Sequence, residues 1–127
     1  MSDVARPVAV TFVESTVFTK RIVRMGLEEP LRRLQLHLAA NPTAGRLDPG
    51  TGGLRKVRLA DPARTRGKRG GARALYLWVP SSRVVYLLFV YSKEDLDTLT
   101  ADQKRALRAV VRAIKHELAG KGHQEGG

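Results

Sequence analysis

The chain has 127 residues, 43% of them hydrophobic, which is enough to bury a core and predicts one folded domain. Its formal net charge of +11, from 23 Lys and Arg against 12 Asp and Glu, favours a polyanionic partner, with nucleic acid first. There is no cysteine, which excludes disulfides, thiolate chemistry and a cysteine zinc site.

The N-terminal segment predicts a strand followed by a helix. Val8–Val13 is β-branched and aromatic, as strands commonly are. Ser15 or Thr16 is placed to cap a helix that ends at Gly26. One face of that helix is apolar at helical spacing and carries Phe18, Ile22 and Met25.

A second helix and a turn-rich segment come next. Pro30 suits the first turn of a helix, because the missing N–H has no partner there in any case. This helix ends at Asn41-Pro42 and has a core-facing stripe of Leu31, Leu34 and Leu38. Asn41–Gly53 consists almost throughout of residues that favour turns.

The remainder predicts three strands and a terminal helix. The strands are Leu54–Ala60, Arg73–Val79 and Arg83–Tyr91. A tight connection at residues 80–82 makes the last two an antiparallel hairpin. Thr100 and Gln103 match a capping box, and the helix that follows has a core face of Leu107, Val110 or Val111, Ile114 and Leu118.

This order of elements predicts an α+β fold: a small, mainly antiparallel sheet with two N-terminal helices packed on it and a C-terminal helix. We expect residues 1–119 to form the domain and residues 120–127 to be a disordered tail. The longest apolar run, Val84–Val90, is too short to span a bilayer, and the N-terminus lacks a signal-peptide pattern. We therefore expect a cytoplasmic protein that does not contact a membrane.

Cations alternate with apolar residues along the first of these three strands. Successive side chains of a strand point to opposite faces, so Lys56 and Arg58 share one face, about 7 Å apart, while Val57 and Leu59 face the core. Arg73 opens the next strand, beside this pair if the two strands are neighbours. The predicted site is a concave patch ringed by Lys56, Arg58, Arg73 and Lys93.

A basic loop joins the first two of these strands, and its cations can follow an RNA backbone. The candidates for RNA or ribosome binding are Arg55, Arg64, Arg66, Lys68 and Arg69. Tyr91, at a strand end near Lys93, is the aromatic residue best placed to stack on a base. The glycine-rich segments at 50–53 and 67–71 do not match the phosphate-loop pattern, and the first favours a flexible turn.

The alternative is that these cations decorate a solvated face, as most surface Lys and Arg do. No carboxylate pair or Ser-His-Asp set stands out, and His37, His116 and His123 are far apart, so we expect no metal and no cofactor. Phosphodiester chemistry can run on cations alone, because its transition state carries extra negative charge on phosphate oxygens. A lysine crowded by other cations can exchange protons near neutral pH, which makes Lys56 the candidate general base.

Several segments, in this order, resemble the RelE/HigB superfamily of bacterial toxin–antitoxin systems, and the HigB-like branch in particular. They are GTGGLRKVRLA (Gly50–Ala60), GKRGGARALYLW (Gly67–Trp78) and VYLLFVYSKEDLDTLT (Val85–Thr100), with a weaker match in FVESTVFTKRI (Phe12–Ile22). The resemblance implies a compact, microbial-RNase-like α+β fold. It also implies cleavage of mRNA in the ribosomal A site, by attack of the 2′-OH on its own phosphate.

The resemblance implies site residues as well. Lys56 and Arg58 match the basic pair on the family's second strand, Arg73 matches the arginine that opens the third, and Lys93 matches the basic region after the last strand. Many family members also use a tyrosine near the C-terminus. None occurs here after Tyr91, so either Tyr91 substitutes for it or that role is missing.

Three functions remain open at this point. The first is a toxin that cleaves mRNA on the ribosome and is neutralised by a cognate helix-turn-helix antitoxin. The second is a basic RNA- or ribosome-binding protein without catalysis. The third is a degenerate toxin that acts only as the partner of a DNA-binding antitoxin repressor.

Overall fold

The structure is a computed structural model that describes residues 9–59, 71–93 and 99–126, with only the backbone described for 121–126. It contains β1 (Thr11–Glu14), α1 (Thr16–Met25), α2 (Glu28–Ala40), β2 (Arg46–Leu47), β3 (Arg55–Leu59), β4 (Ala72–Val79), β5 (Val84–Ser92) and α3 (Ala101–Gly126). The strands form one sheet in the order β1-β5-β4-β3-β2. β1 runs parallel to β5, and the other neighbours are antiparallel. The predicted α+β class and mainly antiparallel sheet are confirmed.

Local signals fix both ends of α1. The Ser15 side chain accepts a 3.0 Å hydrogen bond from the Phe18 N–H, which satisfies one of the free donors of the first turn. Gly26 ends the helix in the left-handed conformation, with φ of 68°, which glycine adopts without a Cβ clash. Both predicted ends are therefore confirmed, and Ser15, not Thr16, is the N-cap.

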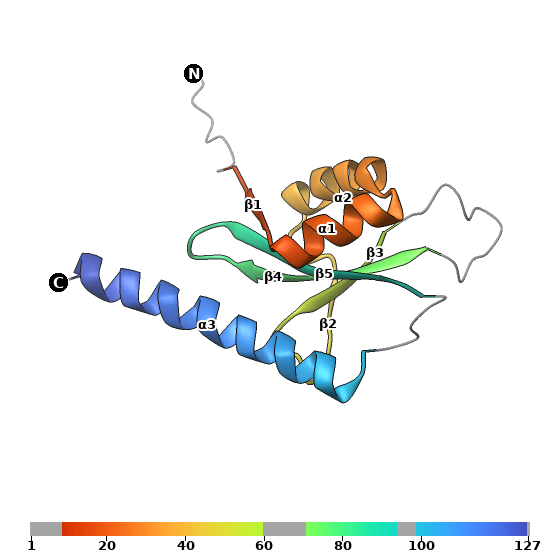
Figure 1. Cartoon of the computed structure of the whole chain (residues 1–127). Coiled ribbons are helices and arrows are strands. Elements are labelled where there is room, and N and C mark those ends of the chain that lie inside the picture. The colour runs from red at the N-terminus through yellow and green to blue at the C-terminus, as the bar shows by residue number, and fades with distance from the viewer. Residues whose placement is uncertain (1–8, 60–70, 94–98, 127) are drawn as a thin grey trace, which may run out of the picture.

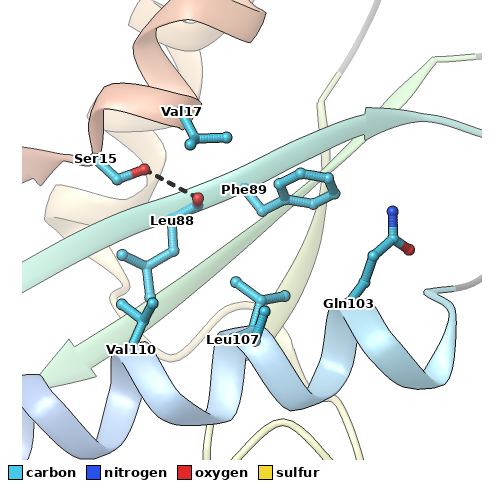
Figure 2. Close-up of a pocket in the computed structure, with 8 residues that line it drawn as sticks. Ser15, Val17, Leu88, Phe89, Gln103, Leu107 and Val110 are labelled. Carbon is cyan, nitrogen blue, oxygen red and sulfur yellow. Dashed lines mark hydrogen bonds between the residues drawn. The ribbon is translucent and has the colours of Figure 1, made fainter.

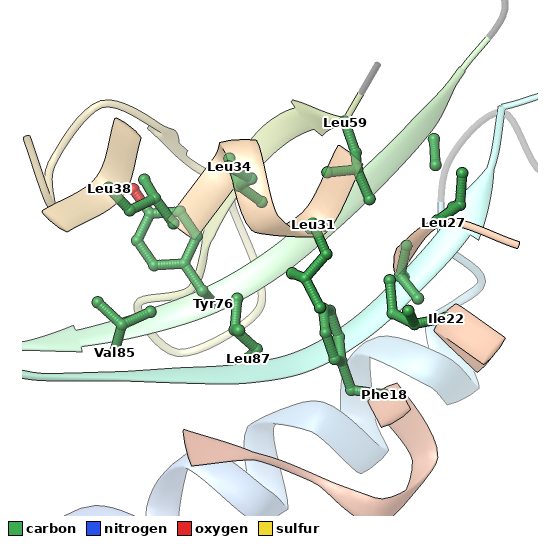
Figure 3. Packing of buried hydrophobic residues seen from close by; sticks show 13 residues of the cluster. Phe18, Ile22, Leu27, Leu31, Leu34, Leu38, Leu59, Tyr76, Val85 and Leu87 are labelled. Atoms are coloured by element: carbon green, nitrogen blue, oxygen red, sulfur yellow. The ribbon is translucent and has the colours of Figure 1, made fainter. Parts of the chain in front are cut away.

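The helices α1 and α2 cover one face of the sheet, and α3 crosses the other (Figure 1). Figure 3 shows the core beneath α1 and α2, where Leu59 of β3 and Tyr76 of β4 meet leucines of α2. This first cluster consists of Phe18, Ile22, Leu27, Leu31, Leu34, Leu38, Leu59, Ala72, Ala74, Tyr76, Val85, Leu87 and Val90. The predicted helix stripes are confirmed, as is the inward direction of Val57 and Leu59.

A second cluster lies between the sheet and α3, and consists of Leu54, Leu75, Leu77, Leu88, Tyr91, Leu99, Leu107 and Val111. The capping box at the start of α3 is confirmed: the Thr100 N–H donates to Gln103 Oε1 (2.9 Å) and the Gln103 N–H to Thr100 Oγ1 (3.1 Å). Of the two predicted alternatives on α3, Val111 is buried and Val110 is exposed. Within the described ranges, no helix has the length and apolar character needed to cross a membrane.

Several elements differ from the prediction. β1 begins at Thr11, because its partner β5 begins opposite it at Val84. β2 was not expected at all, since two residues carry no periodic signal. Residues 120–126 are helical where we expected a disordered tail, because Gly120 does not take the left-handed conformation that ends helices. The assignment of a single domain to residues 1–119 stays a prediction.

The buried hydroxyl of Tyr76 joins β4 to the turn after α2. It donates to the Pro42 carbonyl oxygen (2.7 Å) and accepts from the Gly45 N–H (2.9 Å). A Cβ at Gly45 would lie 2.9 Å from the Tyr76 ring, so this close approach requires glycine. Burial raises the pKa of Tyr76 above its usual value of 10.0, while the Gly45 hydrogen bond and the charge of Arg55 lower it by less.

This raised pKa makes stability depend on alkaline pH. Above a pH of about 10, the unfolded chain releases the Tyr76 proton and the folded chain keeps it, so the free energy of unfolding falls as pH rises. We expect Tyr76→Phe to lower the free energy of unfolding by about 1–3 kcal/mol at neutral pH and to show a shallower alkaline decline. Urea titrations of both proteins at neutral and alkaline pH measure this. An equal alkaline decline in the free energy of unfolding of the two proteins would contradict this prediction.

Candidate active site

The register of the sheet places three predicted site residues side by side. Arg58 of β3 is the direct partner of Arg73 of β4, and Arg73 is the direct partner of Tyr91 of β5. Directly opposed residues of antiparallel strands lie on one face, with Cβ atoms about 4.5–5.5 Å apart. The prediction that Arg73 lies beside the basic strand is therefore confirmed.

Lys56 extends this arrangement along β3. It lies two residues before Arg58 and so shares its face, with Leu75 of β4 and Arg46 of β2 directly opposite it. Leu75 belongs to the second cluster, so this is the face toward α3. Lys56, Arg58 and Arg73, with Arg46 beside them, are called the basic row from here on.

Lys93 reaches the same end of the sheet from β5. Its N–H donates to the Gly71 carbonyl oxygen (3.1 Å), just beyond the pairing of Ala72 with Ser92. Its backbone thus lies next to the residue that precedes β4, close in sequence to Arg73. This agrees with the predicted position of Lys93 beside the cations.

Tyr91 differs from the prediction in its exposure. Its side chain is 1% exposed within the second cluster, and its ring centroid lies 6.1 Å from that of Phe89. A ring that is almost fully buried offers no face to a nucleobase, so the stacking hypothesis for Tyr91 is wrong. The reason is α3, which covers this part of the sheet. A role for the Tyr91 hydroxyl in leaving-group chemistry stays a prediction.

Arg55 lies apart from the basic row. It alternates with Lys56 along β3 and is paired with Tyr76, whose ring lies in the first cluster. Its Nη1 donates to the carbonyl oxygens of Gly45 (2.7 Å) and Thr43 (3.4 Å), which holds the guanidinium against the turn after α2. The other predicted RNA-binding residues, Arg64, Arg66, Lys68 and Arg69, lie outside the described residues.

The glycine-rich segment before β3 is fixed to α3. Gly50, Gly52 and Gly53 all have positive φ, and the Thr51 side chain is fully buried. Three cations of α3 donate to carbonyl oxygens of this segment: Lys104 to Pro49 (3.1 Å), Arg108 to Gly50 (2.6 Å) and Lys115 to Gly52 (3.2 Å). The segment is thus an ordered support for the sheet, where the sequence predicted a flexible turn.

Two pockets lie elsewhere. One, of about 250 Å³, is lined by apolar side chains of β5 and α3 near the start of α1 (Figure 2). The other lies between the end of the β4–β5 hairpin and the C-terminal half of α3. Neither pocket is lined by Lys56, Arg58, Arg73 or Lys93. The concave shape predicted for the site therefore stays a prediction.

His37 and His116 are not part of the basic row. His37 is exposed on α2, which covers the other face of the sheet, and His116 is exposed on α3. Arg46 and Asp48 are the residues that the sequence analysis missed. The alternation of Arg46, Leu47 and Asp48 is the one signal for them, and the surrounding turn residues obscured it.

The fold and the site together define an α+β domain with a row of cations on the α3-facing side of its sheet. No family model matches the chain. The chain is similar to the solved structure of a mutant of the E. coli toxin RelE in the free state, with a TM-score of 0.53 and 17% sequence identity. The match covers 71% of this chain and 90% of that one. Similarity at this identity concerns the backbone, and the chain has a RelE-like fold.

Proposed function

We propose that this protein is the toxin of a type II toxin–antitoxin system, of the HigB-like branch, and that it cleaves mRNA on the ribosome. The observation that carries the proposal is the direct pairing of Arg58 with Arg73, with Lys56 on the same face, on a RelE-like sheet. Guanidinium groups that lie side by side on one face can donate together to the oxygens of one phosphate. A phosphodiester is therefore the ligand that this arrangement suits best.

The proposed reaction is an internal transfer at phosphorus. The mRNA 2′-oxygen loses its proton and bonds to the adjacent phosphorus, and the bond from phosphorus to the 5′-oxygen breaks. The products are a cyclic phosphate and a 5′-oxygen that takes up a proton. Arg58 and Arg73 offset the charge that grows on the phosphate oxygens in the transition state.

The proposal assigns the proton-transfer roles to the remaining residues of the site. Lys56 is the candidate group beside the 2′-OH, and Lys93 or Tyr91 is the candidate at the leaving 5′-oxygen. The burial of Tyr91 favours Lys93, whose side chain is partly exposed. No metal or cofactor has a part in this proposal.

The test is induced expression in a bacterial host with mapping of mRNA ends. Growth arrest with new 5′-OH ends at codon positions supports the enzyme, and loss of those ends when translation initiation is blocked supports the ribosome requirement. Arrest without cleavage would instead support an RNA-binding protein without catalysis. The absence of growth arrest would favour a degenerate toxin that acts only as the partner of a DNA-binding antitoxin repressor.

The proposal also includes a protein partner, a cognate antitoxin with a helix-turn-helix domain. Co-expression of a small neighbouring reading frame that encodes such a protein should restore growth. Co-purification of the two chains, with cleavage suppressed in the complex, is the direct measurement. A neighbouring product that neither binds nor restores growth would contradict this part of the proposal.

A further inference from the structure

Within the described part of the chain, one carboxylate lies beside the basic row. Asp48 directly follows β2, and its Oδ1 lies 3.6 Å from Lys56 Nζ. The Asp48 side chain is only 10% exposed, and that of Lys56 is 34% exposed. By contrast, Glu29 and Asp102 form ion pairs within helices, where both partners are more than half exposed. A shielded pair orders its side chains more than such surface pairs do.

The backbone around Asp48 is fixed at both of its polar groups. Its N–H donates to the Leu54 carbonyl oxygen (2.8 Å), which continues the β2–β3 ladder by one step. Its own carbonyl oxygen accepts from the Thr51 hydroxyl (2.6 Å), and the Thr51 Oγ1 in turn accepts from the Leu54 N–H (3.2 Å). The segment is further held by the three cations of α3. The Asp48 carboxylate therefore stands on a rigid support.

A lysine side chain is long and flexible, and an ammonium ion has no preferred donor direction. Around Lys56 the charged neighbours by register are Arg46, Arg58 and Arg73, which all repel it. Among the residues that the structure describes, Asp48 is the neighbour that attracts it. The direction of the Lys56 ammonium is thus set by Asp48.

We propose that Asp48 is a positioning residue for the mRNA cleavage described above. It holds the Lys56 side chain at a fixed point of the basic row, next to the 2′-OH of an mRNA whose phosphate is bound by Arg58 and Arg73. The inference rests on the proposed function. It gives Lys56 a defined position, in place of a lysine surrounded by cations alone.

The test compares Asp48→Asn with wild type in single-turnover cleavage and in ribosome affinity. We expect the cleavage rate to fall by about 10-fold to 10²-fold, because a misplaced catalytic group loses rate on that scale. Affinity should stay the same or rise, since the variant carries one negative charge fewer near the RNA. Asp48→Glu should restore part of the rate. Glu29→Gln, which removes a distant charge, is the matched control and should leave cleavage unchanged.

A double-mutant cycle separates positioning from a structural role. In a Lys56→Ala background, Asp48→Asn should have no further effect on cleavage, because Asp48 acts through Lys56. The same loss in both backgrounds, or an equal loss of rate and affinity, would overturn the inference.

A measurement that does not depend on cleavage separates the positioning role of Asp48 from the proposed function. The rate at which an acylating reagent modifies Lys56, followed by mass spectrometry, should rise in Asp48→Asn because the amine is no longer held. If the wild-type protein does not cleave RNA, the proposed function is wrong, but the labelling experiment still tests the ion pair. An unchanged Lys56 labelling rate would refute the pairing itself.

Discussion

Arg73→Ala is expected to lower the single-turnover rate of mRNA cleavage by about 10²–10³, the usual effect of removing one preorganised donor to a developing anion. Arg73 lies at the β4 end of the row, directly opposed to both Arg58 and Tyr91. Its guanidinium can contact two phosphate oxygens at once, which the lysine ammonium cannot reproduce. Arg73→Lys should therefore remain nearly as impaired as the alanine variant.

The fold should survive this change. Arg73 is partly exposed at the start of β4, and its side chain donates to the carbonyl oxygen of its neighbour Ala72 (3.2 Å). Arg24→Ala, on the exposed surface of α1, removes the same charge away from the row and should cleave normally. The measurements are cleavage of ribosome-bound mRNA and thermal unfolding. Wild-type cleavage by Arg73→Ala would remove this residue from the site.

Lys56→Ala should lower the cleavage rate by about 10²-fold or more, and far more than it lowers ribosome affinity. One charge lost from a chain with a net charge of +11 is a small part of its attraction to RNA, whereas the lost group acts on the reacting atoms. Single-turnover cleavage at saturating ribosome concentration, with affinity measured separately, distinguishes the two effects.

The counterpart to Lys56→Ala tests whether a histidine side chain takes part in cleavage. A variant with His37, His116 and His123 all replaced by glutamine should stay active, because His37 and His116 are exposed on helices outside the basic row. An inactive histidine variant together with an active Lys56→Ala would show that the chemistry lies on other residues.

Much of the fold follows from short-range patterns. The Ser15 cap, the Gly26 stop and the Thr100–Gln103 box each depend on residues within one helical turn, so the sequence alone predicts them. The alternation of side chains along a strand likewise depends only on neighbouring residues, so the sequence also predicts that Val57 and Leu59 face the core. β2 was missed because two residues show no period, and the ion pair of Asp48 with Lys56 was missed with it.

The site is harder to predict because it depends on contacts between distant segments. The strand adjacency that opposes Arg58 to Arg73 could be proposed from the order of the strands, but the exact register could not. The burial of Tyr91 depends on where α3 docks, and nothing near Tyr91 in the sequence carries that information. The neighbours of the predicted cations were therefore less predictable than the cations themselves.

The contacts between α3 and the segment before β3 have a consequence for synthesis of the chain. Lys104, Arg108 and Lys115 hold carbonyl oxygens that precede them by 55, 58 and 63 residues. Chains fold progressively from the N-terminus as they are made, and contacts between distant residues must wait for both partners. The support beneath Asp48 is therefore completed only when the last helix has been translated, so the nascent chain carries its cations well before their arrangement is final.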